Sequence, residues 1–269
     1  MPSFAPVVPL VVAEKLQASG IYGRYHLLLA HDVAALENIA GYATLFNKVE
    51  PSTIIMDNSV VELGHPVPIE TMIEACKAII GTRYISHRIV VVLPDHMLDG
   101  PATADSTRSA LAEWAPAFQK EFIDVDFMAV PQGEDITTWV KCLEAFSEIE
   151  GITWIGIPRN FREKLTGSRV QACQLAHILN TNWKLHLLGF SDDLHDDIIT
   201  CSMAKSLGWN LKGIDSTVPI RIALKMATPI SFSQSTHTPR GDWWDKPGNL
   251  EDGWKNVEES LHRIRRWIS

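Results

Sequence analysis

The sequence predicts an α/β protein built as a (β/α)8 barrel. Short runs of β-branched residues alternate with amphipathic stretches along the chain. These runs are continuously apolar, as expected for strands of a parallel sheet that is covered on both faces. Eight such strand and helix units fit a barrel of about 250 residues. A doubly wound open sheet is the alternative, because periodicity does not show whether a sheet closes.

The expected elements follow one another in strand and helix order. The strands are expected at residues 7–12, 26–30, 53–56, 89–93, 127–130, 154–157, 185–188 and 213–215. The amphipathic helices are expected at residues 69–80, 104–122, 136–149, 168–179, 193–207 and 218–226. We expect one domain over residues 1–269, with the barrel in residues 1–230.

Residues 231–269 differ in composition from the barrel. Turn dipeptides and a loop with Trp243 and Trp244 precede a helix expected at residues 250–268. That helix ends in Arg263, Arg265 and Arg266, where cations favour the negative end of a helix. We interpret it as packing against the barrel, with contact to nucleic acid as the alternative.

Composition excludes several classes of protein. With 269 residues, of which 46% are hydrophobic, the chain can bury a large core, so a disordered or collagen-like chain is excluded. The longest apolar run is far shorter than the roughly 20 residues of a membrane span. Four widely spaced Cys residues and an N-terminus without a basic segment favour a cytoplasmic protein. The net charge of -8 argues against a general nucleic-acid coat protein.

Polar residues follow most of the expected strands. In a barrel the carboxyl ends of all strands meet at one mouth, where the chemistry of such enzymes takes place. An Asp at a strand end commonly caps the next helix. Three of them together with a Gln favour a functional cluster instead. The four residues are Asp57, Asp95, Gln132 and Asp215.

This set of side chains suits substitution at the anomeric carbon of a sugar. One carboxylate can attack the carbon, while another exchanges protons with the leaving and entering groups. A further Asp and a Gln can hydrogen-bond the edge of a planar heterocycle such as a purine.

The same segments resemble the tRNA-guanine transglycosylase superfamily, whose members exchange guanine in nucleic acid for a 7-deazaguanine base. Asp215, Pro219 and Arg221 stand in register with the family segment Asp-Cys-Val-Leu-Pro-Thr-Arg. Four further segments, in the same order between residues 25 and 226, resemble other family motifs. They are Asp57-Asn58-Ser59, Leu93-Pro94-Asp95 with residues 100–105, Val130-Pro131-Gln132-Gly133, and Leu187-Leu188-Gly189-Phe190.

The resemblance implies roles for these residues. Asp215 is expected to be the nucleophile and Asp57 the proton donor and acceptor. The base is expected to contact Asn58, Ser59, Asp95, Gln132, Gly133, Gly156, Ile157 and Gly189. DNA is expected to contact Arg159, Arg162, Lys164 and Arg221, and Arg169 and residues 263–266 are expected to extend this basic rim. The sequence leaves open whether the protein acts alone or as a homodimer.

Four departures from the family motifs narrow the expected substrate and cofactor. The segment Val60-Val61-Glu62 replaces Gly-Gly-Phe, and Glu134 replaces the second Gly of Gln-Gly-Gly. Residues 157–160 replace Ala-Val-Gly-Glu. The Cys-rich zinc site of the tRNA enzymes has no counterpart, since no Cys follows Cys201, so neither a metal nor another cofactor is expected.

The chain is therefore most similar to the compact phage-encoded DNA 7-deazaguanine transglycosylases. These insert a base such as preQ0 into DNA and so protect the phage genome from restriction, in the host cytoplasm. The alternatives are a tRNA-guanine transglycosylase of the queuosine or archaeosine type, a hydrolase that releases deazaguanine from a nucleoside, and a catalytically silent barrel that binds nucleic acid as a subunit.

One acidic segment could be either a metal site or the start of a helix. Asp192, Asp193, His195, Asp196 and Asp197 could bind a divalent ion, but such a run more often begins a helix, where acids favour the dipole. We therefore expect it to be a helix start.

Overall fold

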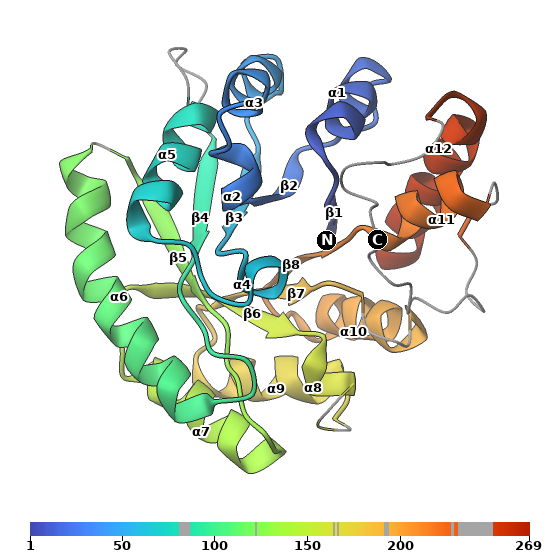
Figure 1. Cartoon of the computed structure of the whole chain (residues 1–269). Coiled ribbons are helices and arrows are strands. Elements are labelled where there is room, and N and C mark those ends of the chain that lie inside the picture. Colours follow the sequence, from blue (N-terminus) through green and yellow to red (C-terminus); the bar gives the residue numbers. More distant parts are fainter. Residues whose placement is uncertain are drawn as a thin grey trace.

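The computed structural model describes residues 1–80, 87–121, 123–163, 165, 167–190, 194–226, 229–230 and 250–269. Eight parallel strands form a nearly closed barrel, with helices around the outside (Figure 1). The strands follow one another round the sheet in the order β1-β8-β7-β6-β5-β4-β3-β2, so the last strand pairs with the first. This order confirms the (β/α)8 barrel and excludes the doubly wound sheet.

The strands place their carboxyl ends at a single mouth. They are β1 (Ser3–Pro6), β2 (Tyr25–Leu29), β3 (Thr53–Asp57), β4 (Arg88–Val92), β5 (Val125–Ala129), β6 (Ile152–Pro158), β7 (Lys184–Leu188) and β8 (Leu211–Ser216). The strand register determines how far along the barrel axis the acids lie, since Asp57 lies opposite Leu29 and Asp215 lies opposite Ala5.

The expected helices are all present, with ends shifted by a few residues at most, and the sequence missed the short ones. The helices are α1 (Leu10–Ala18), α2 (Ala30–Val33), α3 (Ile39–Phe46), α4 (Val60–Leu63), α5 (Ile69–Ile80), α6 (Gly100–Lys120), α7 (Ile136–Ser147), α8 (Asn160–Glu163), α9 (Arg169–Leu179), α10 (Leu194–Leu207), α11 (Val218–Met226) and α12 (Leu250–Ile268). No helix in these described ranges is long and apolar enough to cross a membrane.

The expected first strand, residues 7–12, is wrong. The strand β1 ends at Pro6, and Val11 and Val12 of the expected strand belong to helix α1. In α1 the buried residues are Val12, Ala13 and Leu16, a helical spacing, whereas Val11 is exposed. Local β-propensity is overridden here because one face of the segment packs against the barrel.

Two layers of apolar side chains make up the core. One layer lies between the sheet and the surrounding helices, and the other fills the inside of the barrel. The barrel is therefore a packed core and not a pore. The buried residues of the inner layer are Ala5, Val7, Tyr25, Leu27, Leu29, Ile55, Val90, Val92, Met128, Val130 and Trp154.

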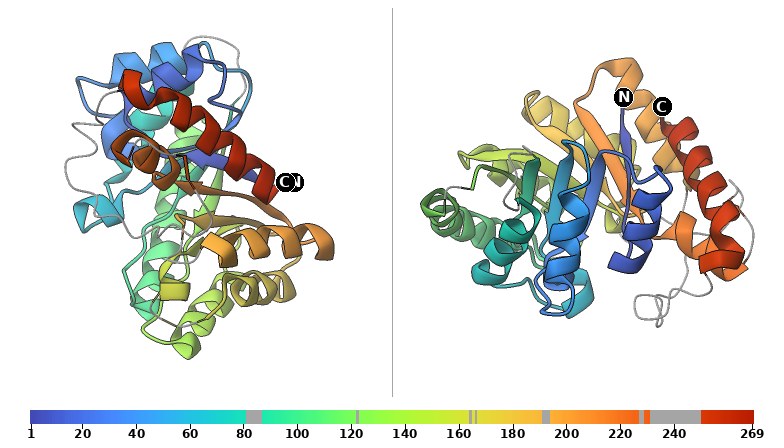
Figure 2. Two further views of the ribbon diagram at one scale, coloured as in Figure 1. Left: turned by 90° about the vertical axis from the view of Figure 1, so that its right-hand side faces the viewer. Right: turned by 90° about the horizontal axis from the view of Figure 1, so that it is seen from above.

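Helix α12 packs against helix α11 and the first strand, beside the amino end of the barrel (Figure 2). It buries Val257, Leu261, Ile264 and Ile268, which recur every three or four residues along one face. This confirms the interpretation that the helix packs on the barrel. The two chain ends lie close together (Figures 1 and 2). Trp243 and Trp244 lie outside the described residues.

Candidate active site

The three expected carboxylates lie at the carboxyl end of the barrel. Asp57 is the last residue of β3, Asp95 follows β4, and Asp215 lies near the end of β8. The negative charges of Asp95 and Asp215 both act on Asp57, which places the three groups around one mouth. The expectation that these acids converge therefore agrees with the geometry.

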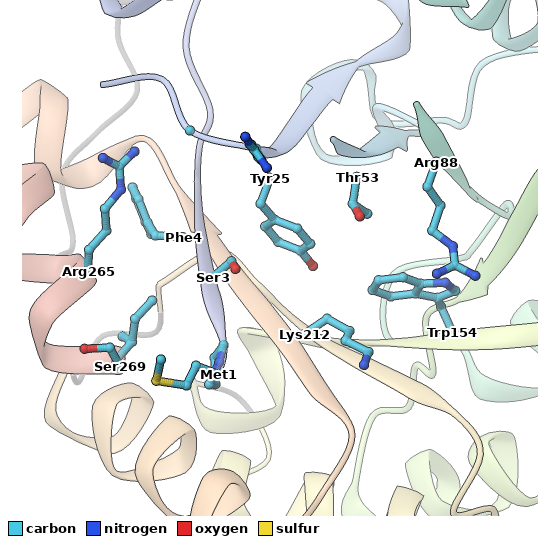
Figure 3. A pocket seen from close by; sticks show the side chains of 14 residues that line it. Met1, Ser3, Phe4, Tyr25, Thr53, Arg88, Trp154, Lys212, Arg265 and Ser269 are labelled. Atoms are coloured by element: carbon cyan, nitrogen blue, oxygen red, sulfur yellow. The ribbon is translucent and has the colours of Figure 1, made fainter. Parts of the chain in front are cut away.

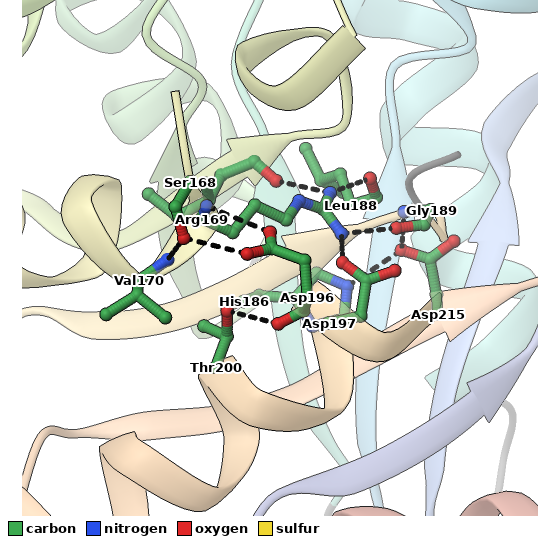
Figure 4. Close-up of polar contacts among 11 residues, drawn as sticks. Ser168, Arg169, Val170, His186, Leu188, Gly189, Asp196, Asp197, Thr200 and Asp215 are labelled. Carbon is green, nitrogen blue, oxygen red and sulfur yellow. Dashed lines mark hydrogen bonds and ion pairs between the residues drawn. The ribbon is translucent and has the colours of Figure 1, made fainter. Parts of the chain in front are cut away.

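Asp215 is held by two N–H donors. His186 Nε2 lies 3.0 Å from Asp215 Oδ1, and the backbone N–H of Gly189 donates to the same oxygen over 2.9 Å (Figure 4). Among the described residues, no donor is assigned to Oδ2. The carboxylate is therefore oriented through one oxygen, and Oδ2 is the one left for a substrate.

His186 in turn contacts a second residue inside the barrel. Its Nδ1 lies 2.7 Å from the hydroxyl of Tyr25, and both side chains are buried. Burial, and next the charge of Asp215, raise the pKa of Tyr25 well above its usual value, so its hydroxyl stays protonated and donates to Nδ1. His186 then carries its proton on Nε2 and donates it to Asp215.

The sequence reasoning missed Tyr25 and His186 as site residues. Both stand in short apolar strands, where a polar side chain is easily taken for part of the core. The available clue was His186, a titratable residue one strand position before the apolar pair Leu187-Leu188 and the strand-end Gly189.

Asp57 has a different environment from Asp215. Burial raises its pKa from the ordinary 3.8 to about 8, and the charges of Glu62, Asp95 and Asp215 act in the same direction. The backbone N–H of Ser59 donates to Asp57 Oδ1 over 2.7 Å and opposes this rise only in part. At neutral pH Asp57 is therefore mostly a carboxylic acid that has a proton to give.

Two residues near the mouth have a left-handed backbone. Ser59, two residues after the end of β3, has φ 62°, and Leu98, in the loop after β4, has φ 64°. Among the described residues these are the non-glycine positions with positive φ. Such conformations cost roughly 1–3 kcal/mol and tend to occur at functional sites. The strained turns support the assignment of this end of the barrel as the site.

A buried network of amide side chains surrounds Asp95. Asn58 Nδ2 donates to Asp95 Oδ1 over 2.9 Å, and Gln132 Nε2 donates to Oδ2 over 2.7 Å. Asn160 Nδ2 then donates to Gln132 Oε1 over 2.9 Å. Burial raises the pKa of Asp95, and the two amide donors oppose that rise. The network joins the ends of β3, β4, β5 and β6, and Asn160 is a member that the sequence reasoning missed.

The three glycines that were expected to contact the purine-like base differ from one another in what surrounds them. A Cβ on Gly133 would meet the backbone of Trp139 in α7, and a Cβ on Gly156 would meet the side chains of Leu188, Met128 and Val130. Packing thus accounts for both glycines. Gly189 has φ 65° and contacts Asp215 through its N–H, so it belongs to the site itself.

Ile157 and Arg169 lie away from the mouth surface. The side chain of Ile157 is buried in the layer between sheet and helices, so it does not contact a base at the mouth. Arg169 is fully buried and pairs with Asp197 over 2.8 Å. It also donates to the backbone carbonyls of Ile157, Leu188 and Gly189, which holds the turn that carries the Gly189 N–H (Figure 4). The expectation that Arg169 belongs to a basic rim is wrong.

The other expected nucleic-acid contacts differ in exposure. Arg159 is exposed and lies beside Gly189, and Arg162 in α8 is half-buried. Arg221 is only 7% exposed and offers little surface to a nucleic acid. Lys164 lies outside the described residues. Arg263 and Arg265 contact the carbonyls of Ile230 and Ile21, so residues 263–266 do not extend a rim at the mouth.

The acidic segment begins a helix, as expected. Asp196 accepts from Ser168 Oγ and the backbone N–H of Arg169, at the start of α9, and Asp197 pairs with Arg169. Asp192 and Asp193 lie outside the described residues. In the part of the chain that the structure describes, no group of three or more His, Cys, Asp or Glu residues could hold a metal ion.

No family model matches the chain, and a search of curated proteins finds no match. Membership of the transglycosylase superfamily therefore stays a prediction from the strand-end residues.

Proposed function

We propose that this protein is a glycosyltransferase that exchanges guanine in DNA for a 7-deazaguanine base through a covalent intermediate on Asp215. One observation carries the proposal. Two carboxyl groups at the mouth differ in a way that suits different roles. Burial raises the pKa of Asp57 and keeps it protonated, whereas Asp215 accepts two N–H donors through Oδ1 and has Oδ2 available to attack a substrate. Paired groups that differ in this way are typical of acid and nucleophile assignments.

In the first step Asp215 Oδ2 attacks C1′ of a deoxyguanosine. The bond between C1′ and N9 breaks, and guanine leaves with the electron pair of that bond. Asp57 gives its proton to the leaving base and becomes a carboxylate. The sugar is then joined to Asp215 as an ester, and its configuration is inverted.

In the second step the incoming base loses its N9 proton to the Asp57 carboxylate. Its nitrogen attacks C1′ while the ester bond to Asp215 breaks. The second inversion restores the β configuration and returns both acids to their starting states. The raised pKa of Asp57 suits this exchange, because one group must give and take a proton near neutral pH.

The buried amide network is suited to read the base. Guanine and 7-deazaguanine present the same N1–H and exocyclic amine, which are donors. Each oxygen of Asp95 accepts one amide hydrogen and has a lone pair left for a base donor. The other N–H of the Gln132 amide can donate to the base carbonyl. Because the two bases share this edge, one network serves both halves of the exchange.

DNA is the proposed nucleic acid, and the target guanine must leave the base stack to reach the mouth, at a cost of a few kcal/mol. The exposed Arg159 lies beside Gly189, where the backbone of the flipped nucleotide would pass. The choice of DNA depends on the sequence, which has no Cys-rich zinc motif after Asp215. Modification of phage DNA against restriction is the role that this activity would serve.

Incubation with labelled preQ0 tests the proposal. Duplex DNA and tRNA are offered in parallel, digested to nucleosides and analysed by mass. Label in DNA, lost in Asp215→Asn and kept in the exposed matched control Asp105→Asn, supports the proposal. Label in tRNA alone would overturn the choice of DNA. Release of guanine without incorporation would identify a hydrolase, and no reaction on either substrate would refute the enzyme.

A further inference from the structure

A second cavity lies at the opposite end of the barrel from the three acids. It has a volume of ≈ 610 Å³ and is lined by residues at or near the amino ends of several strands. Figure 3 shows Arg265 on one side of Tyr25, and Arg88 with Trp154 on the other. A volume of this size matches that of pockets which hold small organic ligands.

The cations near Trp154 outnumber the carboxylates. Asp126 accepts from Arg88 Nε over 2.7 Å and from Lys184 Nζ over 3.1 Å. The indole N–H of Trp154 and the hydroxyl of Thr153 donate to the same carboxylate. One carboxylate therefore serves two cations and two neutral donors.

Lys212 and Arg265 are the cations without a carboxylate partner. Both line the cavity, and neither forms an ion pair with a described acid. Arg265 donates instead to the backbone carbonyls of Ile21 and Tyr22. Burial lowers the pKa of Arg265, and burial with the nearby charges of Lys184 and Arg88 lowers that of Lys212.

Lys184 and Arg88 repel Lys212, and an anion in the cavity would relieve this repulsion. The whole chain has a net charge of -8, so this excess of positive charge is local to the amino end. Lys212, Lys184 and Arg88 share the single carboxylate of Asp126, which leaves an excess of about two positive charges. A phosphate ester carries about -1.5 to -2 charges at pH 7, which matches this excess, and guanidinium groups bind its oxygens well.

We propose that the cavity at the amino end of the barrel binds a phosphoryl group, carried by free phosphate or by a small organic phosphate. Lys212 would bind the phosphoryl oxygens together with Arg88, whose guanidinium lies on the same side of Tyr25 (Figure 3). The rings of Tyr25, Trp154 and Phe4, which also line the cavity, provide apolar surface for the rest of an organic ligand. This site is separate from the mouth and does not depend on the transglycosylase proposal.

Calorimetric titration tests the site, with inorganic phosphate and AMP as probes at low ionic strength. Purification tags are removed first, because Met1 and Ser269 also line the cavity. The test variant is Lys212→Gln, whose side chain is exposed, and the matched control is the exposed Lys141→Gln on α7. We expect saturable binding that weakens about tenfold in Lys212→Gln, is unchanged in Lys141→Gln, and is largely kept in Lys212→Arg.

The two probes distinguish the ligand sources. Tighter binding of AMP than of phosphate would identify an organic phosphate, and equal binding would identify free phosphate. The proposal is overturned if neither probe binds, if Lys212→Gln binds like the unmodified protein, or if succinate binds as tightly as phosphate. Asp215→Asn should bind both probes normally, since it changes only the mouth.

Discussion

The two ends of the barrel have opposite charge although the same strands build both. The carboxyl end has Asp57, Asp95 and Asp215, whereas the amino end has unpaired cations at Lys212 and Arg265. A net charge of -8 therefore describes neither end. The comparison teaches that charge in a barrel must be assigned to one end or the other before it is used to infer partners.

The two ends also differ in how far their polar groups are satisfied. At the mouth Asp215 and Asp95 each accept two hydrogen bonds at fixed positions, next to turns with strained backbone. At the amino end Lys212 and Arg265 have no carboxylate partner among the described residues. Preorganised donors and acceptors suit catalysis, whereas uncompensated charge suits the binding of a counter-ion.

The largest effect is expected for Asp215→Asn. The amide keeps the shape but is a much poorer nucleophile, so base exchange should fall on the order of 10⁴-fold or more. Trapping of a covalent adduct with DNA, followed by denaturing electrophoresis, should show none. A variant that still forms the adduct would contradict the assignment of the nucleophile.

The next largest effect is expected for Asp57→Asn. Loss of the acid should slow adduct formation by about 10²–10⁴-fold, the usual contribution of a general acid. In the unmodified protein, single-turnover adduct formation should decline as the pH rises through about 8, where Asp57 loses its proton. A flat profile between pH 6 and pH 9 would rule out Asp57 as the proton donor.

The same substitution should make the protein more stable. The pKa of Asp57 is higher when folded, about 8, than its ordinary 3.8, so the folded state binds the extra proton between these values. The free energy of unfolding therefore decreases as the pH rises from 3.8 to about 8, and below pH 3.8 Asp57 has no effect on it. Asn removes the penalty, so denaturant unfolding should show a gain at pH 8 and none at pH 3.5. A variant less stable at pH 8 would contradict the raised pKa.

A smaller effect is expected for Asp95→Asn. The amide presents a donor to the base where the carboxylate presents an acceptor, so the preference for guanine-like bases should fall by about 10-fold to 100-fold. Competition between labelled preQ0 and adenine in the exchange reaction measures this preference. Unchanged selectivity would remove Asp95 from base recognition.

Much of this architecture was predictable from the sequence, because parallel strands bring their ends to one place. Asp57, Asp95 and Asp215 could be assigned to the mouth from their positions after apolar runs. The first strand was misplaced because Val11 and Val12 favour a strand locally, and only packing against the barrel makes them helical.

The parts that escaped prediction depend on contacts between distant segments. Tyr25 and His186 are 161 residues apart in the chain and meet only inside the closed barrel. Arg169 reads as a surface charge in the sequence, yet it is buried because Asp197 and three backbone carbonyls compensate it. The cationic cavity likewise depends on which charges lack partners, and a sequence does not record that.

Tyr25→Phe should have the smallest effect and sharpens the comparison most, because Tyr25 contacts both ends. Its ring lines the amino-end cavity, while its hydroxyl holds the Nδ1 of His186, which holds Asp215. Without the hydroxyl, His186 is free to carry its proton on Nδ1, and its Nε2 then no longer donates to Asp215.

We expect exchange to slow about threefold to tenfold, the cost of about one hydrogen bond, and ¹⁵N NMR of His186 to show a mixture of tautomers. Phosphate binding should be unchanged, since the hydroxyl is directed to His186. If instead phosphate binding weakens as in Lys212→Gln while exchange and the tautomer stay the same, the hydroxyl belongs to the amino end. His186 would then be only a buried core residue, and the orientation of Asp215 would depend on the Gly189 N–H alone.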